Sequence, residues 1–275
     1  MQRIIDEFEQ SKKKKLVPFI TAGDPSIEMT LHLMETMVSA GADIIELGVP
    51  FSDPMADGPV IQRASDRALM NNVGLQDIFG LVKDFRARGH QTPIVLMGYL
   101  NPIEHMGITA FSAAAQDAGV DGVLIVDLPP EEAKEMAPIL SAHQLALIFL
   151  VSPTTTPERM AQIAEHASGY LYYVSLRGVT GASNLNIEEV ESKIAELKSH
   201  TALPVLVGFG IKDAETAKNV APVAEGVVMG SALVETIEKQ CTKESASEQQ
   251  KQRCLEAVSD LIGTVKTAIT ETEPS

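Results

Sequence analysis

The amino-acid sequence predicts an α/β protein, a single-domain (β/α)8 barrel with an extra helix at its N-terminus and another at its C-terminus. Short apolar, β-branched runs alternate eight times with longer segments whose apolar residues recur at helical spacing. This alternation predicts parallel strands joined by right-handed crossovers. Eight such units in roughly 240 residues fit the TIM-barrel architecture better than an open sheet, which more often has five or six strands.

The expected strands are short apolar runs bounded by turn residues, and a segment with helical periodicity follows each of them. Ile27, Leu31 and Met34, for example, would share one face of a helix after the first strand. No Pro-, Ser- or Gly-rich linker divides the chain, so residues 1–275 are expected to form one domain, although the length alone also allows two. The strands are expected at residues 16–21, 43–49, 93–99, 122–127, 146–151, 170–175, 204–208 and 226–229.

The two ends of the chain lie outside this repeat. Residues 1–15 are expected to form an amphipathic helix that covers the N-terminal end of the barrel, followed by a solvated loop with the lysines of residues 12–15. The barrel itself is expected to span residues 16–238. Residues 239–275 contain a polar stretch, then a final outer helix in residues 255–269 and a frayed tail.

Composition excludes several classes of function. The chain has 22 Lys plus Arg and 37 Asp plus Glu, so its formal charge of −15 disfavours binding to nucleic acids and to anionic membranes. Its cysteines, Cys241 and Cys254, lie in a polar stretch that suits neither a disulfide framework nor a metal site, and its six histidines lack metal-binding spacing. No segment resembles a signal peptide or a membrane span, so a cytoplasmic location is expected.

Glu46 is the first candidate for a catalytic residue. Alternate residues of a strand share a face, so Ile45 and Leu47 would pack under the helices while Glu46 would point into the barrel. A carboxylate is costly to bury there without a partner, and the C-terminal end of the strands is the catalytic face of this fold. The pattern leaves a structural role open, in which Glu46 pairs with a buried arginine or amide.

A stiff loop follows the strand that carries Glu46. Residues 48–59 contain three prolines and two further carboxylates, too long and too rigid a segment for a plain connector. Asp57 precedes Gly58 and Pro59, which form a turn that can direct its side chain back over the barrel mouth. Both aspartates of the loop could instead accept hydrogen bonds from turn amides only. Together, Glu46 and Asp57 suit paired acid–base work on a bound ligand.

Glycines after the last strands predict a phosphate site. Residues 208–210 are Gly-Phe-Gly after the seventh expected strand, and Gly230 with Ser231 follows the eighth. Barrels often bind phosphate at these two loops through backbone N–H groups and a helix N-terminus, although glycines at strand ends are more often simple turns. The segment 178–181, after the sixth expected strand, could close over the same ligand as a lid.

An apolar, flat-walled pocket is expected beside the two acids and the phosphate site. Inward-facing side chains near the strand ends would line this pocket, and for the Met and Leu members core packing is favoured over ligand contact. These side chains are Phe19, Met97, Tyr99, Leu124, Val126, Leu150 and Tyr172.

Six stretches of the sequence are together similar to a known family. In their order through about residues 16–237 they resemble the tryptophan synthase α-subunit family, and the stretch from Glu46 to Pro59 is the most specific. The resemblance implies a lyase of tryptophan biosynthesis that cleaves indole-3-glycerol phosphate, by a retro-aldol reaction, into indole and glyceraldehyde 3-phosphate. The stretches are PFITAGDPS at 18–26, IELGVPFSDPMADGPVIQ at 45–62, MGYLNPI at 97–103, GVTGA at 178–182, GFGI at 208–211 and MGSALV at 229–234.

The resemblance also implies roles for individual residues. Glu46 is the acid/base that protonates C3 of the indole ring and takes the proton of the C3′ hydroxyl, and Asp57 is the partner of the indole N–H. Thr180 is a lid residue that meets Asp57 on closure. By the same resemblance, the indole is bound by Phe19, Leu124 and Tyr172, and the phosphate by Gly181, Gly210, Gly230 and Ser231.

A protein partner is implied as well. Members of the family work with a β subunit that carries pyridoxal phosphate and uses the indole for L-tryptophan synthesis, in an α2β2 heterotetramer. Asp53, Asn101 and Pro102 would face this β subunit. The chain itself is expected to need no cofactor and no metal.

Two other functions are open from the sequence. Another phosphate-binding barrel of aromatic amino-acid biosynthesis would use a different acid–base set, often with a lysine, and no lysine falls within the eight expected strands. A catalytically silent regulatory subunit would bind the phosphate ligand and activate a partner. Such a subunit would not need both Glu46 and Asp57.

Overall fold

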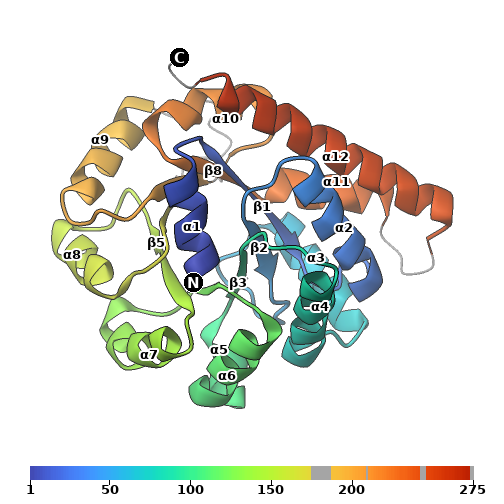
Figure 1. Ribbon diagram of the computed structural model, residues 1–275, viewed down its shortest axis with the longest axis horizontal. Helices are drawn as coiled ribbons and strands as arrows, with labels where there is room; N and C mark the ends of the chain where they lie inside the picture. Colours follow the sequence, from blue (N-terminus) through green and yellow to red (C-terminus); the bar gives the residue numbers. More distant parts are fainter. Residues whose placement is uncertain (175–186, 209, 242–245, 273–275) are drawn as a thin grey trace.

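Eight parallel strands close into a barrel in the computed structural model, which describes residues 1–174, 187–208, 210–241 and 246–272. Each strand pairs with the next one in sequence and the last pairs with the first, so the predicted (β/α)8 architecture is confirmed (Figure 1). The strands are β1 (Lys15–Thr21), β2 (Ile45–Gly48), β3 (Ile94–Gly98), β4 (Gly122–Ile125), β5 (Ala146–Val151), β6 (Leu171–Val174), β7 (Val205–Gly208) and β8 (Gly226–Met229).

Helices surround the barrel and connect its strands. Among the described residues, no helix is both long and apolar enough to span a membrane. The helices are α1 (Gln2–Gln10), α2 (Ile27–Ser39), α3 (Pro59–Met70), α4 (Leu75–Ala87), α5 (Leu100–Met106), α6 (Ile108–Ala118), α7 (Pro130–Ala142), α8 (Pro157–His166), α9 (Ile187–Lys198), α10 (Ala214–Val220), the 3₁₀ turn η2 (Ala221–Val223), α11 (Ser231–Gln240) and α12 (Glu248–Thr270).

The strands are apolar on both faces, and the two faces belong to different parts of the core. Ile45 and Leu47 of β2 pack in the layer under the helices, whereas Val95 of β3 packs inside the barrel. The strand register places Glu46 beside Phe19 of β1 and Val95 of β3. The inward orientation expected for Glu46 from strand alternation therefore holds in the structure.

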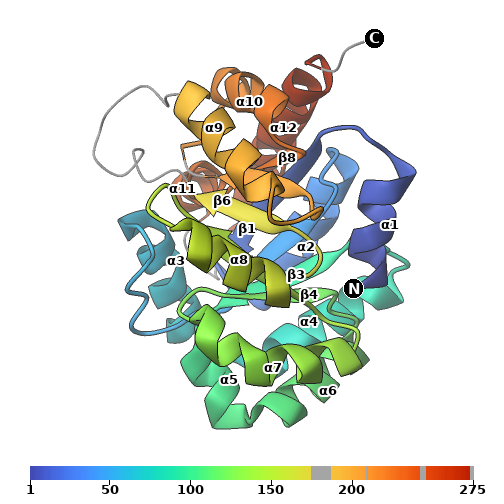
Figure 2. The ribbon, with the colours of Figure 1, turned by 90° about the vertical axis from the view of Figure 1, so that its left-hand side faces the viewer.

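Helix α1 closes the N-terminal end of the barrel. Ile4 is fully buried among the interior side chains, and the ring of Phe8 lies 6.2 Å from that of Tyr170. Figure 1 shows α1 across the middle of the strands, and Figure 2 shows it at the opposite end of the barrel from α3. The other end of the barrel is the one available to a ligand.

A buried carboxylate anchors this cover. Asp121, just before β4, is 1% exposed, and its two oxygens accept hydrogen bonds from Arg3 Nη1 at 3.0 Å and Arg86 Nη2 at 2.8 Å. Its Oδ2 also accepts from the backbone N of Ile94 at 3.0 Å, and the amino group of Met1 lies 3.6 Å from Oδ1. One carboxylate thus ties α1, α4 and β3 together.

The prediction of a solvated loop at residues 12–15 is wrong for Lys15. Strand β1 begins at this lysine, whose side chain is 2% exposed with Nζ 2.8 Å from Glu7 Oε1 in α1. The nearby carboxylate compensates for the burial of the ammonium group. A lysine therefore does lie within a strand, contrary to expectation, but at the end of the barrel that α1 covers, where it can supply no acid/base to the C-terminal mouth.

The C-terminal helix is longer than expected and is packed against the barrel's outer layer. Helix α12 has 23 residues and lies along α2, α10 and α11 (Figure 1). Its buried face includes Cys254, and Cys241 is buried as well, so the polar surroundings expected for both thiols are wrong. Apolar residues recurring along α12 explain the burial.

Candidate active site

A cavity of about 560 Å³ opens at the C-terminal ends of the strands. Its wall consists of strand ends, the segments that follow them, and residues near the starts of α3, α8 and α11. Both expected acids and most of the expected apolar side chains line it, namely Glu46, Asp57, Phe19, Met97, Val126, Leu150 and Tyr172. The volume is in the range of sites that bind small molecules.

Glu46 combines complete burial with access to this cavity. Its side chain is 0% exposed, and Oε1 accepts a hydrogen bond from the hydroxyl of Tyr170 at 2.7 Å. Oε2 has no hydrogen-bond partner in the described part of the chain. Burial raises the pKa of Glu46 to about 7, and the Tyr170 bond opposes this rise only in part. A carboxyl group with this pKa can both give and take a proton near neutral pH.

The pKa of Glu46 makes folding stability depend on pH. Its folded value of about 7 lies above its ordinary 4.5, so between these values the folded chain binds more protons than the unfolded chain. The contribution of Glu46 to the free energy of unfolding is therefore complete below pH 4.5 and falls by about 3 kcal/mol as the pH rises through 7. Urea unfolding of the wild type and of Glu46→Gln at several pH values measures the difference.

In that experiment the Glu46→Gln variant serves as its own control. Because glutamine does not titrate, Glu46→Gln should gain stability relative to the wild type as the pH rises through this range. A difference between the two proteins that is independent of pH would show that Glu46 is not protonated in the folded chain at neutral pH.

Asp57 is held by a tyrosine at the end of the neighbouring strand. The hydroxyl of Tyr99 donates to Asp57 Oδ2 at 3.0 Å and accepts a hydrogen bond from the backbone N of Ala56 at 3.1 Å. The ring of Phe51 stacks on Tyr99 with centroids 5.2 Å apart. Burial raises the pKa of Asp57, and the Tyr99 hydrogen bond counteracts it. Two bonds and a stacked ring thus fix the loop and the direction of its carboxyl group.

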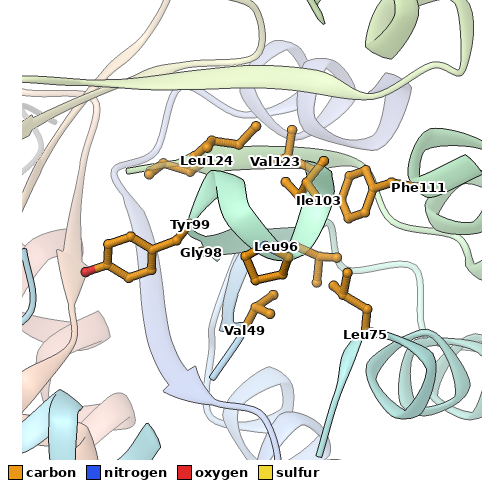
Figure 3. A pocket seen from close by; sticks show the side chains of 11 residues that line it. Val49, Leu75, Leu96, Gly98, Tyr99, Ile103, Phe111, Val123 and Leu124 are labelled. Carbon is orange, nitrogen blue, oxygen red and sulfur yellow. The ribbon is translucent and has the colours of Figure 1, made fainter. Parts of the chain in front are cut away.

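Tyr99 does not line the large cavity as expected. Its ring borders a small void of about 10 Å³ behind the cavity wall, among apolar residues that include Leu96, Ile103 and Phe111. Figure 3 shows the hydroxyl of Tyr99 pointing away from these side chains. The structure therefore assigns Tyr99 to the support of the loop and not to the pocket wall.

We expect Tyr99→Phe to lower the rate of the reaction at this cavity by roughly tenfold, because a hydrogen bond to a charged group contributes about 1.5–3 kcal/mol. Loss of the bond also raises the pKa of Asp57 further, so the acidic limb of the pH–rate profile should move to higher pH. Steady-state kinetics across pH 5–9 measure both effects. Tyr173→Phe is the matched control, since the Tyr173 hydroxyl is buried without a partner among the described residues; equal behaviour of the two variants would contradict the assignment.

Two glycines leave room for the aromatic walls. A Cβ at Gly48, at the end of β2, would lie 2.6 Å from Cζ of Phe19, and a Cβ at Gly208, at the end of β7, would collide with the ring and hydroxyl of Tyr172. Side chains larger than hydrogen at these positions would push both rings out of place. Gly208, the first glycine of the Gly-Phe-Gly run, therefore has a packing function.

Leu124 was expected beside these aromatics but does not line the large cavity. Its side chain is 1% exposed, packs in the barrel interior and borders the small void, not the large cavity. Leu150 and Val126 instead form the apolar wall from β5 and the end of β4.

The far end of the cavity has the features of an anion site. Gly210, Gly230 and Ser231 line it, and α11 begins at Ser231, so backbone N–H groups are available there. Gly210 has a φ of 81°, which favours glycine at this turn. Phe209, Thr180 and Gly181, which the sequence analysis also assigned here, lie outside the described residues.

Sequence reasoning missed several polar side chains of the site, among them Ser152 and Thr155 on the cavity wall. Lys212 and Arg159 line the cavity and bring positive charge to it, and Arg159 also lies 3.4 Å from Glu131. Tyr170, the partner of Glu46, could have been found, because it shares a strand face with Tyr172 at a spacing of two. Lys212 lies in the loop after β7, and Arg159 lies near the start of α8. No periodic pattern in the sequence indicates where the side chains of these two residues point.

The residues expected to face a partner lie on the rim. Asp53 is exposed and accepts a hydrogen bond from Ser52 Oγ at 2.6 Å, and the neighbouring Met55 is 83% exposed. Asn101 and Pro102 lie in α5, a short helix after β3 that the sequence analysis did not anticipate. The loop and α5 therefore present polar and apolar side chains next to the cavity mouth.

The geometry defines a class of protein. A closed barrel holds two carboxyl groups, aromatic walls and an anion site around one cavity, and no three His, Cys, Asp or Glu side chains gather to hold a metal in the described ranges. Such a cavity is typical of an acid–base enzyme that acts on a ligand with an apolar ring and an anionic end. The family model described as "Tryptophan synthase alpha chain" matches residues 5–267, and the chain belongs to this family. It is accordingly a lyase of tryptophan biosynthesis.

Relatives and solved structures agree with this assignment. The tryptophan synthase alpha chain of Marinobacter nauticus is 56% identical over 246 residues, 90% of this chain and 91% of the relative. That of Ralstonia nicotianae is 53% identical over 272 residues, 98% of this chain and 99% of the relative. The crystal structure of tryptophan synthase subunit alpha from Legionella pneumophila has a TM-score of 0.88 at 44% identity, covering 98% of this chain and 99% of the other.

Proposed function

We propose that this chain cleaves indole-3-glycerol phosphate by a retro-aldol reaction into indole and glyceraldehyde 3-phosphate, with Glu46 as acid/base and Asp57 as the partner of the indole N–H. The observation that carries the proposal is the state of Glu46. Its pKa is raised to about 7 by burial, and its second oxygen has no partner while the residue lines the cavity. A neutral carboxyl group aimed at a ligand is what protonation of a ring carbon requires.

The proposed steps balance in protons and electrons. Protonated Glu46 gives its proton to C3 of the indole ring, which leaves the positive charge on the ring nitrogen. Asp57 accepts a hydrogen bond from the N–H and stabilises this charge. The Glu46 carboxylate then takes the proton of the C3′ hydroxyl, the C3–C3′ bond breaks, and its electron pair returns to the ring. Indole and the aldehyde form, and Glu46 is protonated again.

The cavity supports binding of both ends of this substrate. Phe19 and Tyr172 offer flat apolar surfaces for the ring, and Leu124, which belongs to the same interior cluster as Tyr172, is proposed with them. For the phosphate we propose Gly210, Gly230 and Ser231 through backbone N–H groups and the start of α11. The ammonium group of Lys212, on the same wall, adds an attractive charge in a protein that is otherwise acidic. Thr180 and Gly181 are proposed from the family resemblance alone.

We propose that a β subunit with pyridoxal phosphate receives the indole, in an α2β2 heterotetramer. Asp53, Asn101 and Pro102 lie on exposed or half-exposed rim segments that could meet it, and the exposed Met55 adds apolar surface there. The chain itself would need no cofactor. The two unpaired cysteines fit a reducing compartment, which supports a cytoplasmic location. The packing of α1 and α12 on the barrel supports one domain for residues 1–275.

The deciding experiment mixes the purified chain with indole-3-glycerol phosphate and follows the release of indole. The absence of tryptophan from the chain keeps its indole fluorescence background low. Indole release that requires the chain supports the proposal, and a faster release on addition of a tryptophan synthase β subunit supports the proposed partner. Tight binding of the substrate with no indole released, with or without the β subunit, would favour the catalytically silent regulatory subunit.

A further inference from the structure

Helices α3 and α11 start at two different parts of the same cavity. Asp57 and Gly58 immediately precede α3, and Gly230 and Ser231 stand at the start of α11; all four residues line the cavity. Figure 2 shows the two helices next to each other at the end of the barrel opposite α1. The distance between the proposed ring-nitrogen partner and the proposed phosphate site therefore depends on how these helices are held together.

An ionic cluster joins the two helices, and its member in α11, Glu238, lies about two turns after Ser231. Glu238 of α11 accepts from Arg63 of α3 through both oxygens, with Nε–Oε1 and Nη2–Oε2 distances of 2.7 Å each. Arg67, one turn further along α3, donates from Nη1 to Glu238 Oε1 at 2.8 Å. We call Arg63, Arg67 and Glu238 the helix clamp. The pKa of Glu238 is lowered to about 2 by these arginines, as a firmly held carboxylate requires.

The clamp is also fixed to the barrel. The other edge of the Arg67 guanidinium binds both oxygens of Asp24, which follows β1 and is 3% exposed, at 2.7 and 2.8 Å. Beneath the charged groups, Ile61 and Ala64 of α3 pack with Val234 of α11 and Phe19 of β1. A planar fork engaged on two sides restricts movement more than a single ion pair does. The clamp thus sets the position of α11 relative to α3 and β1.

We infer that Glu238 and Arg67 are positioning residues that fix the separation between Asp57 and the anion site at Gly230 and Ser231. A substrate that spans both ends of the cavity needs this separation to be correct, whereas a ligand that occupies only one end does not. A shift of about 1 Å in a reacting group can cost up to about 100-fold in rate. The inference rests on the proposed function, because it assumes a substrate with its ring at one end and its phosphate at the other.

The test is Glu238→Ala in the full chain. This change removes the ionic contacts between α11 and α3 but leaves their apolar contacts in place. Buried Asp24 stays paired with Arg67. We expect kcat/KM for indole-3-glycerol phosphate to fall by roughly 10- to 100-fold. The affinities for two fragments, indole and inorganic phosphate, measured one at a time by calorimetry, should stay within about twofold, since each fragment contacts one side only. A substitution that merely destabilised the fold would weaken the fragments together with the substrate.

The matched control is Glu235→Ala, a change of the same residue type one turn earlier in α11. Glu235 is half exposed and pairs with Lys239 of its own helix, so this variant should behave as the wild type. Glu238→Gln, whose amide oxygen can replace Oε1 and still accept from Arg63 Nε and Arg67 Nη1, should recover part of the activity. The inference is overturned if Glu238→Ala retains wild-type kcat/KM, or if it loses affinity for the fragments as strongly as for the substrate. A wild-type chain that releases no indole would instead refute the proposed function, while the fragment affinities remain measurable.

Discussion

Glu46→Gln is expected to lower kcat for indole release by roughly 10²–10⁴-fold, the range for loss of a general acid/base. Glutamine has nearly the shape of glutamate, and its amide oxygen can still accept the hydrogen bond from Tyr170. It cannot protonate a ring carbon or take a proton from a hydroxyl. Substrate binding should therefore persist, because Phe19 and Tyr172 and the anion site are unchanged. Single-turnover kinetics with separate measurement of substrate affinity distinguish these two effects.

Glu104→Gln provides the control for this variant. Glu104 lies on exposed α5, close in sequence to the proposed partner residues but outside the cavity wall. Its substitution removes the same charge and should leave kcat unchanged. If Glu46→Gln retained most of the turnover, Glu46 would be removed from the mechanism, and the proton would have to come from another group.

Asp121→Ala is expected to reduce the free energy of unfolding by about 3–5 kcal/mol, the usual loss when one partner of a buried charged cluster is removed. Arg86, whose side chain is 11% exposed, would lose its carboxylate partner. Arg3 would lose its ion pair with the same carboxylate. Burial already lowers the pKa of Arg86 to about 10, so the environment of this guanidinium is unfavourable to an unpaired charge. Urea denaturation at pH 7 measures the loss.

Asp117→Ala, four residues earlier, is the matched control. Asp117 is 72% exposed and pairs with Lys83, itself 52% exposed, so its removal should cost less than about 1 kcal/mol. Equal effects of the two substitutions would show that Asp121 is not an anchor of the N-terminal cover. Activity per folded molecule should stay close to wild type for Asp121→Ala, because α1 and Asp121 lie at the end of the barrel opposite the cavity.

Much of the fold follows from local patterns in the sequence. Strand alternation placed Ile45 and Leu47 under the helices and Glu46 inside the barrel, since the period of two leaves only two choices of face. The boundaries were less exact. Lys15 belongs to β1 because Glu7, eight residues earlier in another element, compensates for its charge. No local pattern contains that information.

The sequence predicted which residues belong to the site better than it predicted the contacts between them. The loop with Asp57 was identified from its prolines and carboxylates. The hydrogen bonds between this loop and Tyr99 could not be predicted, because they depend on where β3 ends. The helix clamp and its link to Asp24 were missed because Asp24, Arg67 and Glu238 lie on three segments far apart in sequence. Leu124 was placed on the pocket wall because alternation gives the face of a residue but not which inward side chains border the cavity.

The two oxygens of Glu46 have different surroundings, and this difference has a consequence for the origin of hydrogen atoms in the product. One oxygen is bound by Tyr170, and the other has no partner on a residue that lines the cavity. A ligand that fills the cavity separates the carboxyl group from bulk water. In the proposed reaction the hydrogen placed on the ring carbon is then the one that Glu46 held before the ligand arrived, and the hydroxyl hydrogen replaces it. The hydroxyl hydrogen then stays on Glu46 until the products leave the cavity, and only after that can the carboxyl group exchange it with water.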